Sequence, residues 1–231
     1  MLFGANVANA QPVFVKYLYL AKKRGAKVVV VNPLREPGLE RYWVPSNVES
    51  AVFGTKVADE FYGVRTGGDI AFVNGVLKLM LAHGTIDRKF VTDHTTGFDA
   101  LLQELEEESF SDLERSSGVG RIEMDRFATT YGRARSAVLV WSMGITQHAH
   151  GVENVRAIVN LGLARGNVGR PGAGLMPIRG HSGVQGGAEM GCYATAFPGG
   201  LPVSEANAAA LEAQWGFPVP STPGFDAAAM V

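Results

Sequence analysis

Residues 27–33 read Lys-Val-Val-Val-Val-Asn-Pro, and this stretch decides the fold class. An unbroken run of β-branched residues is typical of a strand buried on both faces of a parallel sheet, and the Asn-Pro pair ends it. Residues 11–24 have apolar residues at helical spacing, and residues 1–4, Met-Leu-Phe-Gly, have the pattern of a strand's end. Strand, helix and strand make one βαβ unit. The sequence therefore predicts an α/β fold with a parallel sheet and flanking helices.

The rest of the chain continues this alternation. The expected elements are mostly loop over residues 34–66, a helix over 69–81 with Asp69 as its N-cap, several short helices over 86–134 with 122–133 the most regular, a buried strand over 137–141 and a helix over 152–164. From residue 166 glycine is frequent without a fixed period, which predicts a folded but irregular segment. Residues 217–231 show no convincing element.

The composition excludes several classes of protein. The 231 residues carry 21 Lys and Arg against 22 Asp and Glu, a net charge of -1, which gives no support to nucleic-acid binding. Cys192 is the single cysteine, so a disulfide framework and a Cys-rich metal or iron–sulfur site held by this chain alone are excluded. The 29 glycines exceed the usual share of ~7%.

The sequence shows no membrane span and no export signal. No apolar run reaches the ~18 residues of a spanning helix, and residues 1–4 do not begin a signal peptide. The cytoplasm is therefore the default location, although a longer N-terminus would have room for an export signal. A strand that already ends at residue 4 is a rare start for a native chain, so we expect an internal fragment.

Gly4, Asn6 and Asn9 stand where the first strand ends and a helix begins. In a doubly wound sheet this position borders the ligand crevice, a helix N-terminus suits a phosphate, and glycine permits close approach of the backbone. The same pattern also fits a strand-to-helix turn capped by asparagine. It is not the GxGxxG fingerprint of nicotinamide dehydrogenases.

Two further strand ends carry candidate ligand-binding residues. Asn32 stands where dinucleotide folds place an acidic residue on the ribose; it can bond a hydroxyl or a base, or only form an Asn-Pro turn. After the next buried strand, Met143 offers soft contact surface and Gln147 an amide that could bond a ring edge. Thr146 and Gln147 fit turn and cap residues equally well. His148 and His150 have a poor spacing for a helical metal pair, and no metal site is expected.

The most informative stretch is residues 177–187, Pro-Ile-Arg-Gly-His-Ser-Gly-Val-Gln-Gly-Gly. Arg179 and His181 stand among glycines that expose backbone amides, which suits an anionic ligand. Arg179 also fits a structural ion pair. Cys192 follows the stretch without a recognisable catalytic triad, and a lone cysteine is more often a buried small hydrophobe than a nucleophile.

In their order, these motifs resemble those of one family. They are G-x-N at 4–6, V-N-P at 31–33, Gly-Gly-Asp at 67–69, W-S-M-G-x-T-Q at 141–147, G-N-x-G-x-P-x-A-G at 166–174 and P-I-R-G-H-S-x-V-Q-G at 177–186. The family is that of the catalytic (alpha) subunits of molybdopterin oxidoreductases, in the formate-dehydrogenase-like branch of the DMSO reductase superfamily. The likeness covers residues 1–218.

The resemblance implies a Rossmann-like domain over residues 1–179 that grips one of two molybdopterin guanine dinucleotides around molybdenum or tungsten. Residues 180–231 would then be a partial segment of the adjoining cofactor-binding domain. By the same resemblance the cofactor contacts fall on Gly4, Asn6, Asn9, Asn32, Pro33, Gly67, Gly68, Asp69, Met143, Gly144, Gln147, Gly180 and His181. Arg179 falls on the catalytic arginine that orients an anionic substrate near the metal.

The sequence also departs from the family pattern. Asn32 replaces a common acidic residue, the loop over 35–64 is longer than in plain formate dehydrogenases, and His181 stands where an amide is frequent. The family's Cys-rich motif and its cysteine or selenocysteine metal ligand lie upstream of the first strand, and its closing C-terminal domain is absent. A 4Fe–4S cluster is therefore expected only in a missing N-terminal part, and this piece alone is expected to be inactive.

The expected activity of the whole protein is two-electron oxidation or reduction of a small anionic substrate. The resemblance also implies an electron-transfer subunit or acceptor, and neither nucleic acid nor a membrane span is expected. The alternative from another class is a non-catalytic nucleotide-binding α/β module. A nicotinamide dehydrogenase is disfavoured because GxGxxG is missing and Asn32 is not acidic.

Overall fold

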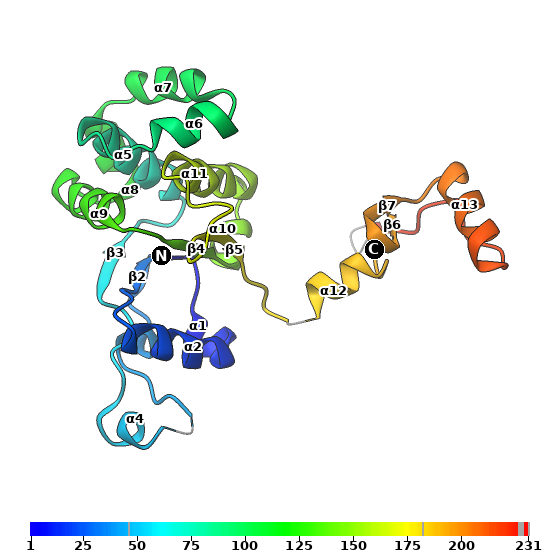
Figure 1. The fold of residues 1–231 in the computed structure, drawn as a ribbon, viewed down its shortest axis with the longest axis horizontal. Coiled ribbons are helices and arrows are strands. Elements are labelled where there is room, and N and C mark those ends of the chain that lie inside the picture. Colours follow the sequence, from blue (N-terminus) through cyan, green and yellow to red (C-terminus); the bar gives the residue numbers. More distant parts are fainter. Residues whose placement is uncertain (46, 182, 226–228, 231) are drawn as a thin grey trace. The chain divides into compact units, whose positions relative to one another are not determined.

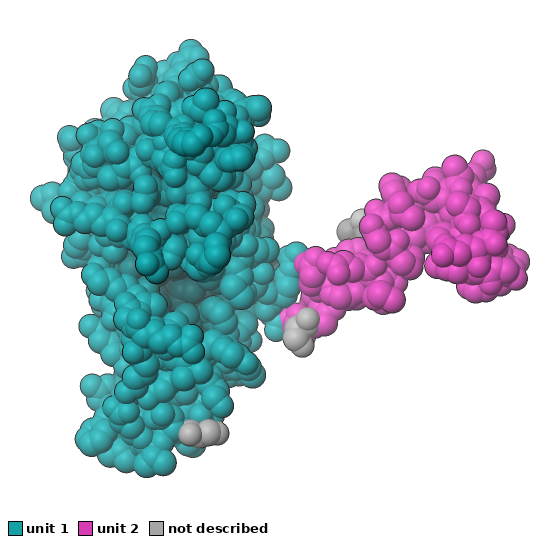
Figure 2. All heavy atoms as spheres, in the orientation of Figure 1, with its two compact units in different colours: residues 1–180 teal, residues 181–231 magenta. Residues whose placement is uncertain are grey.

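The structure is a computed structural model that describes residues 1–45, 47–181, 183–225 and 229–230. The chain divides into two compact units, Met1–Gly180 and His181–Val231, which are described separately (Figure 1, Figure 2). No helix among the described residues is long and apolar enough to cross a membrane.

A single sheet of five parallel strands organises the first unit, in the order β3–β2–β1–β4–β5. The strands are β1 (Leu2–Phe3), β2 (Val29–Asn32), β3 (Glu60–Gly63), β4 (Val138–Trp141) and β5 (Gly174–Pro177). Leu2 pairs with Val30 on one side and Val140 on the other, so β1 is the central strand. The strand order reverses between β1 and β4, as in doubly wound folds. The predicted α/β class with a Rossmann-like parallel sheet is confirmed.

Two of these strands correct the sequence analysis. The expectation of mostly loop over residues 34–66 is wrong where it covers β3, and the segment expected to be irregular after residue 166 contains β5. Both are edge strands: β3 pairs with β2 alone, and β5 with β4 alone, among the described residues. An edge strand has one neighbour and less burial, so its sequence lacks the continuous apolar run of a central strand.

The helices of the first unit connect the strands and cover the sheet. They are α1 (Val7–Ala10), α2 (Pro12–Lys23), α3 (Pro37–Glu40), α4 (Val48–Phe53), α5 (Asp69–Ala82), α6 (Arg88–His94), α7 (Phe98–Glu107), α8 (Phe110–Ser117), α9 (Arg121–Arg133), α10 (Met143–Thr146) and α11 (Gly151–Ala164). The long predicted helices are confirmed within one or two residues. Asp69 is not the N-cap of α5, however, but its first residue, and Gly68 is the cap.

The sheet buries both faces, because successive side chains of a strand point to opposite sides. Phe3, Val29 and Val31 belong to one hydrophobic cluster, with side chains of α5, α9 and α11. Leu2 and Val30 belong to a second cluster, with side chains of α1 and α2. Figure 1 shows these two groups of helices on opposite sides of the sheet. The valine run is therefore covered on both sides, as its composition predicts.

The second unit is smaller and has its own apolar centre. It contains α12 (Val184–Glu189), β6 (Ala196–Phe197), the 3₁₀ helix η1 (Pro198–Gly200), β7 (Leu201–Pro202) and α13 (Glu205–Trp215). The strands pair antiparallel, and Phe197, Ala208, Leu211 and Val219 form the cluster. Cys192 is exposed, so the expectation of a buried cysteine is wrong. In the described part of 217–231 no helix or strand follows α13.

Candidate functional site

All five parallel strands end at the same edge of the sheet, which we call the carboxyl edge. The loops after them carry every predicted site residue of the first unit: Gly4, Asn6 and Asn9 after β1, Asn32 and Pro33 at and after β2, Gly67, Gly68 and Asp69 after β3, Met143, Gly144 and Gln147 after β4, and Arg179 and Gly180 after β5. His181 belongs to the second unit, and its neighbour Ser182 lies outside the described residues. Ligands of doubly wound folds bind at this edge, at the point where the strand order reverses.

Two glycines bring the loops after β1 and β4 into contact at that reversal point. The Gly144 N–H donates to the Gly4 carbonyl oxygen at 3.1 Å. A Cβ on Gly144 would lie 2.6 Å from the Gly4 oxygen, and a Cβ on Gly4 would lie 2.7 Å from the Gly144 carbonyl carbon. Gly4 also has φ +52°, which favours glycine. The close backbone approach that Gly4 allows is thus an approach to the β4 loop.

Asn32 ties the end of β2 to the β1 loop. Its Oδ1 accepts from the Ala5 N–H at 3.2 Å, and its Nδ2 donates to the Ala5 carbonyl oxygen at 3.4 Å. The residue is only 5% exposed. Both polar groups of this side chain are therefore engaged within the chain, and a contact with a nucleoside stays a prediction.

The asparagines of the β1 loop begin a short helix. Asn6 is the N-cap of α1, and its side chain accepts from the Asn9 N–H at 3.4 Å. The capping interpretation of the G-x-N pattern is therefore present in the structure. Asn9 is exposed at the carboxyl edge, and a ligand contact for either side chain stays a prediction.

The start of α5 forms a second part of the edge. Gly67 has φ +82°, and a Cβ on it would meet no atom within 4 Å. A Cβ on Gly68, in contrast, would lie 2.7 Å from the Ser116 carbonyl oxygen. Burial raises the pKa of the Asp69 carboxyl, and the charge of His148 acts in the opposite direction. An N-terminus of a 14-residue helix, with an acceptor side chain beside it, thus lies next to the β4 loop.

The β4 loop is held from within the chain and leaves two predicted residues exposed. His148 Nε2 donates to the Gly144 carbonyl oxygen at 2.8 Å, and Asn154 Nδ2 donates to the Ile145 carbonyl oxygen at 3.1 Å. Met143 and Gln147 are exposed on the same loop. A Cβ on Gly180 would lie 3.1 Å from the Met143 Cε, so the chain after β5 passes close to this methionine.

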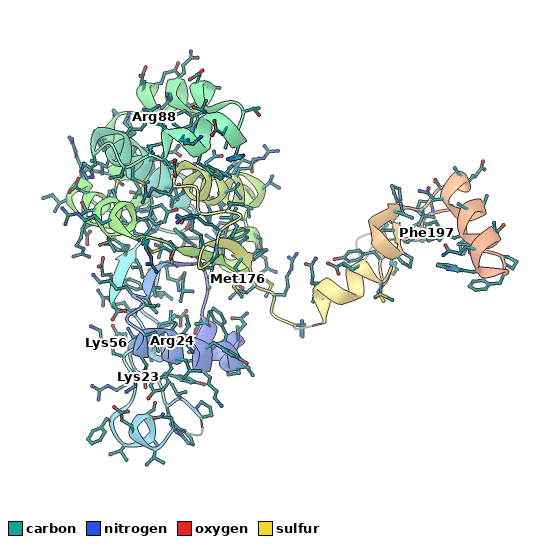
Figure 3. All side chains as sticks on the ribbon, in the orientation of Figure 1. Lys23, Arg24, Lys56, Arg88, Met176 and Phe197 are labelled. Atoms are coloured by element: carbon teal, nitrogen blue, oxygen red, sulfur yellow. The ribbon has the colours of Figure 1, made fainter. Side chains whose placement is uncertain are left out.

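Arg179 follows β5, two residues after the strand leaves the sheet. Figure 3 labels Met176 on β5, just before this point. The Arg179 side chain is exposed, while its carbonyl oxygen accepts from Gln11 Nε2 at 2.8 Å. The preceding carbonyl, that of Ile178, accepts from Ser142 Oγ at 3.1 Å. The loops after β1, β4 and β5 are therefore joined by hydrogen bonds.

Sequence reasoning missed Gln11, Ser142 and His148 as parts of this edge. Ser142 stands inside the recognised W-S-M-G motif, but Gln11 has no local signal, since its partner is 168 residues away. The sequence offers His148 only as half of a poorly spaced metal pair. Among the described residues no group of three or more His, Cys, Asp and Glu side chains is placed to hold a metal ion.

A separate cavity lies beside the edge strand β3. Its volume is about 660 Å³, and Arg35, Phe61 and Arg126 are among its lining residues. The Arg35 guanidinium lies 4.6 Å from the centre of the Phe61 ring. None of the predicted site residues lines this cavity, so the candidate site is the loop-built carboxyl edge.

Comparison with known proteins identifies the class. The family model of the molybdopterin oxidoreductases matches residues 1–216. The chain therefore belongs to the molybdopterin oxidoreductase family, within the DMSO reductase superfamily. Acetylene hydratase from Pelobacter acetylenicus shares the fold, with a TM-score of 0.62 over 74% of this chain and 22% of that one, at 22% sequence identity.

Particular relatives are similar over nearly the whole chain. Protein YdeP of Escherichia coli K12 is 37% identical over 98% of this chain and 30% of its own length. Uncharacterized oxidoreductase Rv2900c of Mycobacterium tuberculosis is 35% identical over 100% of this chain and 30% of its own length. Formate dehydrogenase H of Escherichia coli K12 is 32% identical over 93% of this chain and 28% of its own length. The chain thus spans about 30% of the length of these relatives.

Proposed function

We propose that the chain forms the dinucleotide-gripping part of a molybdenum- or tungsten-dependent oxidoreductase that acts on a small anionic substrate. The observation that carries the proposal is the meeting of the loops after β1, β4 and β5 at the reversal point of the sheet, in a chain of the molybdopterin oxidoreductase family. Formate-dehydrogenase-like activity is the version that the formate dehydrogenase H relative supports.

The residues of the carboxyl edge fit a large dinucleotide cofactor. Gly67 leaves open space in front of the α5 N-terminus, where unpaired N–H groups favour a negatively charged group. Asp69 accepts hydrogen bonds and therefore suits the N–H edge of a guanine better than a phosphate. Gln11 Oε1 is buried and has no hydrogen-bond partner among the described residues, so a donor of the cofactor would satisfy it.

We assign the cofactor grip to residues 1–179 and a part of the adjoining cofactor-binding domain to residues 180–231. When bound, the molybdopterin guanine dinucleotides and their metal would supply two-electron redox chemistry. The chain's own contribution is to bind and orient. Loops from five strands present backbone N–H groups, the Asp69 carboxylate and the Met143 and Gln147 side chains at one edge.

In this proposal Arg179 is the residue that holds the substrate. Its guanidinium offers paired N–H donors in a planar fork that matches a carboxylate or a similar anion. Fixing the anion in one orientation lowers the barrier for the following step by removing rotational freedom. The electrons would pass to a 4Fe–4S cluster and an acceptor outside this chain.

The test replaces Arg179 in the full-length enzyme. We expect Arg179→Ala to lower kcat/KM for small carboxylate substrates at least about 100-fold, because the charged donor pair is lost, while metal and pterin contents stay normal. Arg179→Lys should recover only a part, since an ammonium group lacks the planar fork. Arg24→Ala, which removes an exposed arginine at the end of α2, is the matched control. Normal turnover by Arg179→Ala would contradict the assigned role.

A further inference from the structure

The backbone at Arg179 is held by two side chains from the loops at the reversal point. Ile178 still bonds to the neighbouring strand β4: its N–H donates to the Trp141 carbonyl oxygen at 2.9 Å. The Ile178 carbonyl then accepts from Ser142 Oγ at 3.1 Å, and the Arg179 carbonyl accepts from Gln11 Nε2 at 2.8 Å. Two successive carbonyl groups are thus bonded by two different loops.

Both donors are themselves well anchored. Ser142 is 8% exposed and follows β4 directly. Gln11 ends α1 and precedes Pro12 at the start of α2, so its backbone is confined between two helices, and proline restricts it further. The Gln11 side chain does not cap α2; its Nε2 is directed to Arg179 instead.

The location gives these bonds a consequence. Arg179 is the last residue but one of the first unit, and the second unit begins at His181. The two bonds add to the sheet bond at Ile178 in restraining the segment that leads out of the unit. These bonds restrain the backbone position from which the Arg179 side chain extends, even though that long side chain is exposed.

We propose that Gln11 and Ser142 are positioning residues that fix Arg179 for anion binding. This inference rests on the proposed function, because it takes Arg179 as the substrate-holding residue. Gln11 and Ser142 act through the backbone of Arg179 and are not assigned contact with the substrate. One hydrogen bond of this kind raises the ratio of the ordered to the locally opened backbone at Arg179 by a factor of about five to ten.

The first measurement needs no cofactor. Trypsin cleaves after arginine, so the rate of cleavage at the Arg179–Gly180 bond of the 231-residue chain reports how often this backbone opens. We expect Gln11→Glu, which removes the donor at nearly constant volume, and Ser142→Ala to raise that rate about fivefold. Gln103→Glu, an exposed glutamine of α7, is the matched control and should leave it unchanged. An unchanged cleavage rate in both Gln11→Glu and Ser142→Ala would overturn the proposal.

The second measurement asks whether the order matters for anion binding. In the metal-loaded full-length enzyme, with formate as the probe, Ser142→Ala should weaken binding about tenfold at unchanged metal content, because Ser142 bonds the Ile178 carbonyl and is assigned no cofactor contact. Ser142→Thr, which keeps the hydroxyl donor, should restore both the affinity and the slow cleavage. Faster cleavage with unchanged formate affinity would overturn the positioning role. If the unaltered enzyme binds no formate or other small carboxylate, the proposed function fails and the positioning role with it, while the cleavage rates still record the two bonds.

Discussion

Single residues at the carboxyl edge combine structural and binding roles. Asn32 and Gly144 were predicted as cofactor contacts, yet the structure shows each holding the loop after β1, through the Ala5 backbone and the Gly4 carbonyl. Such partners could not be predicted, because residues 27 and 140 positions apart meet only after the sheet forms. Arg179, Met143 and Gln147 could be placed at this edge from sequence, since each follows a strand of the parallel sheet.

Asp69 predicts a pH-dependent stability at the scale of one residue. Burial raises the pKa of its carboxyl above the usual value of 3.8. At pH values above the raised pKa the carboxyl is ionised in both states, and burying its charge costs folding free energy, so the unfolded chain is favoured. Asp69→Asn should therefore raise the Tm at pH 7.5, and the gain should shrink as the pH falls through the raised pKa. Thermal unfolding of both chains between pH 7.5 and pH 4.5 checks this.

The control for that experiment is Asp99→Asn, because Asp99 also lies in the first turn of a helix but is exposed. A gain from Asp69→Asn that is constant with pH, or that grows toward acid, would contradict the stated sign.

At the scale of elements, the central strands were predictable and the edge strands were not. β2 is buried at all four positions, so its valine run has no polar interruption. β3 buries only Tyr62 and begins with a glutamate, and β5 begins with glycine and ends with proline. Both patterns favour loops over strands when judged locally. They become strands because β2 and β4 offer them unpaired backbone groups.

The contact between the β1 and β4 loops gives a prediction at this scale. Gly144→Ala places a methyl group within 2.6 Å of the Gly4 carbonyl oxygen, so the loops must separate. We expect the free energy of unfolding to fall by ~1–3 kcal/mol, as for other overpacked sites. Urea unfolding of the chain is the measurement. Gly174→Ala on β5, where a Cβ meets no atom within 4 Å, should change it by less than about 0.5 kcal/mol. Equal effects from the two substitutions would refute the close contact.

At the scale of the whole molecule, the two units differ in how much core they own. Both large hydrophobic clusters consist of residues of Met1–Gly180, whereas the second unit has one cluster of four buried residues. The motif order could assign the family over nearly the whole chain, but local patterns did not predict α13 of the second unit. Weak amphipathic patterning of its alanine-rich sequence explains that difference.

This division predicts that a chain ending at Gly180 folds without the second unit. Since it keeps both clusters and the complete five-stranded sheet, we expect cooperative urea unfolding with a midpoint close to that of the 231-residue chain. Circular dichroism across a urea titration measures it. A broad, non-cooperative transition would show that residues 181–231 are needed for the first unit.

In the proposed function this carboxyl edge binds a molybdopterin guanine dinucleotide. We would measure the content of metal and of releasable guanine nucleotide in the purified full-length protein, with and without Asp69→Ala, which removes the acceptor side chain at the start of α5. We expect one molybdenum or tungsten with two guanine nucleotides per unaltered protein, and a clear loss of both in the variant. A correctly folded full-length protein, isolated from cells that make the cofactor, with neither metal nor guanine nucleotide would contradict it.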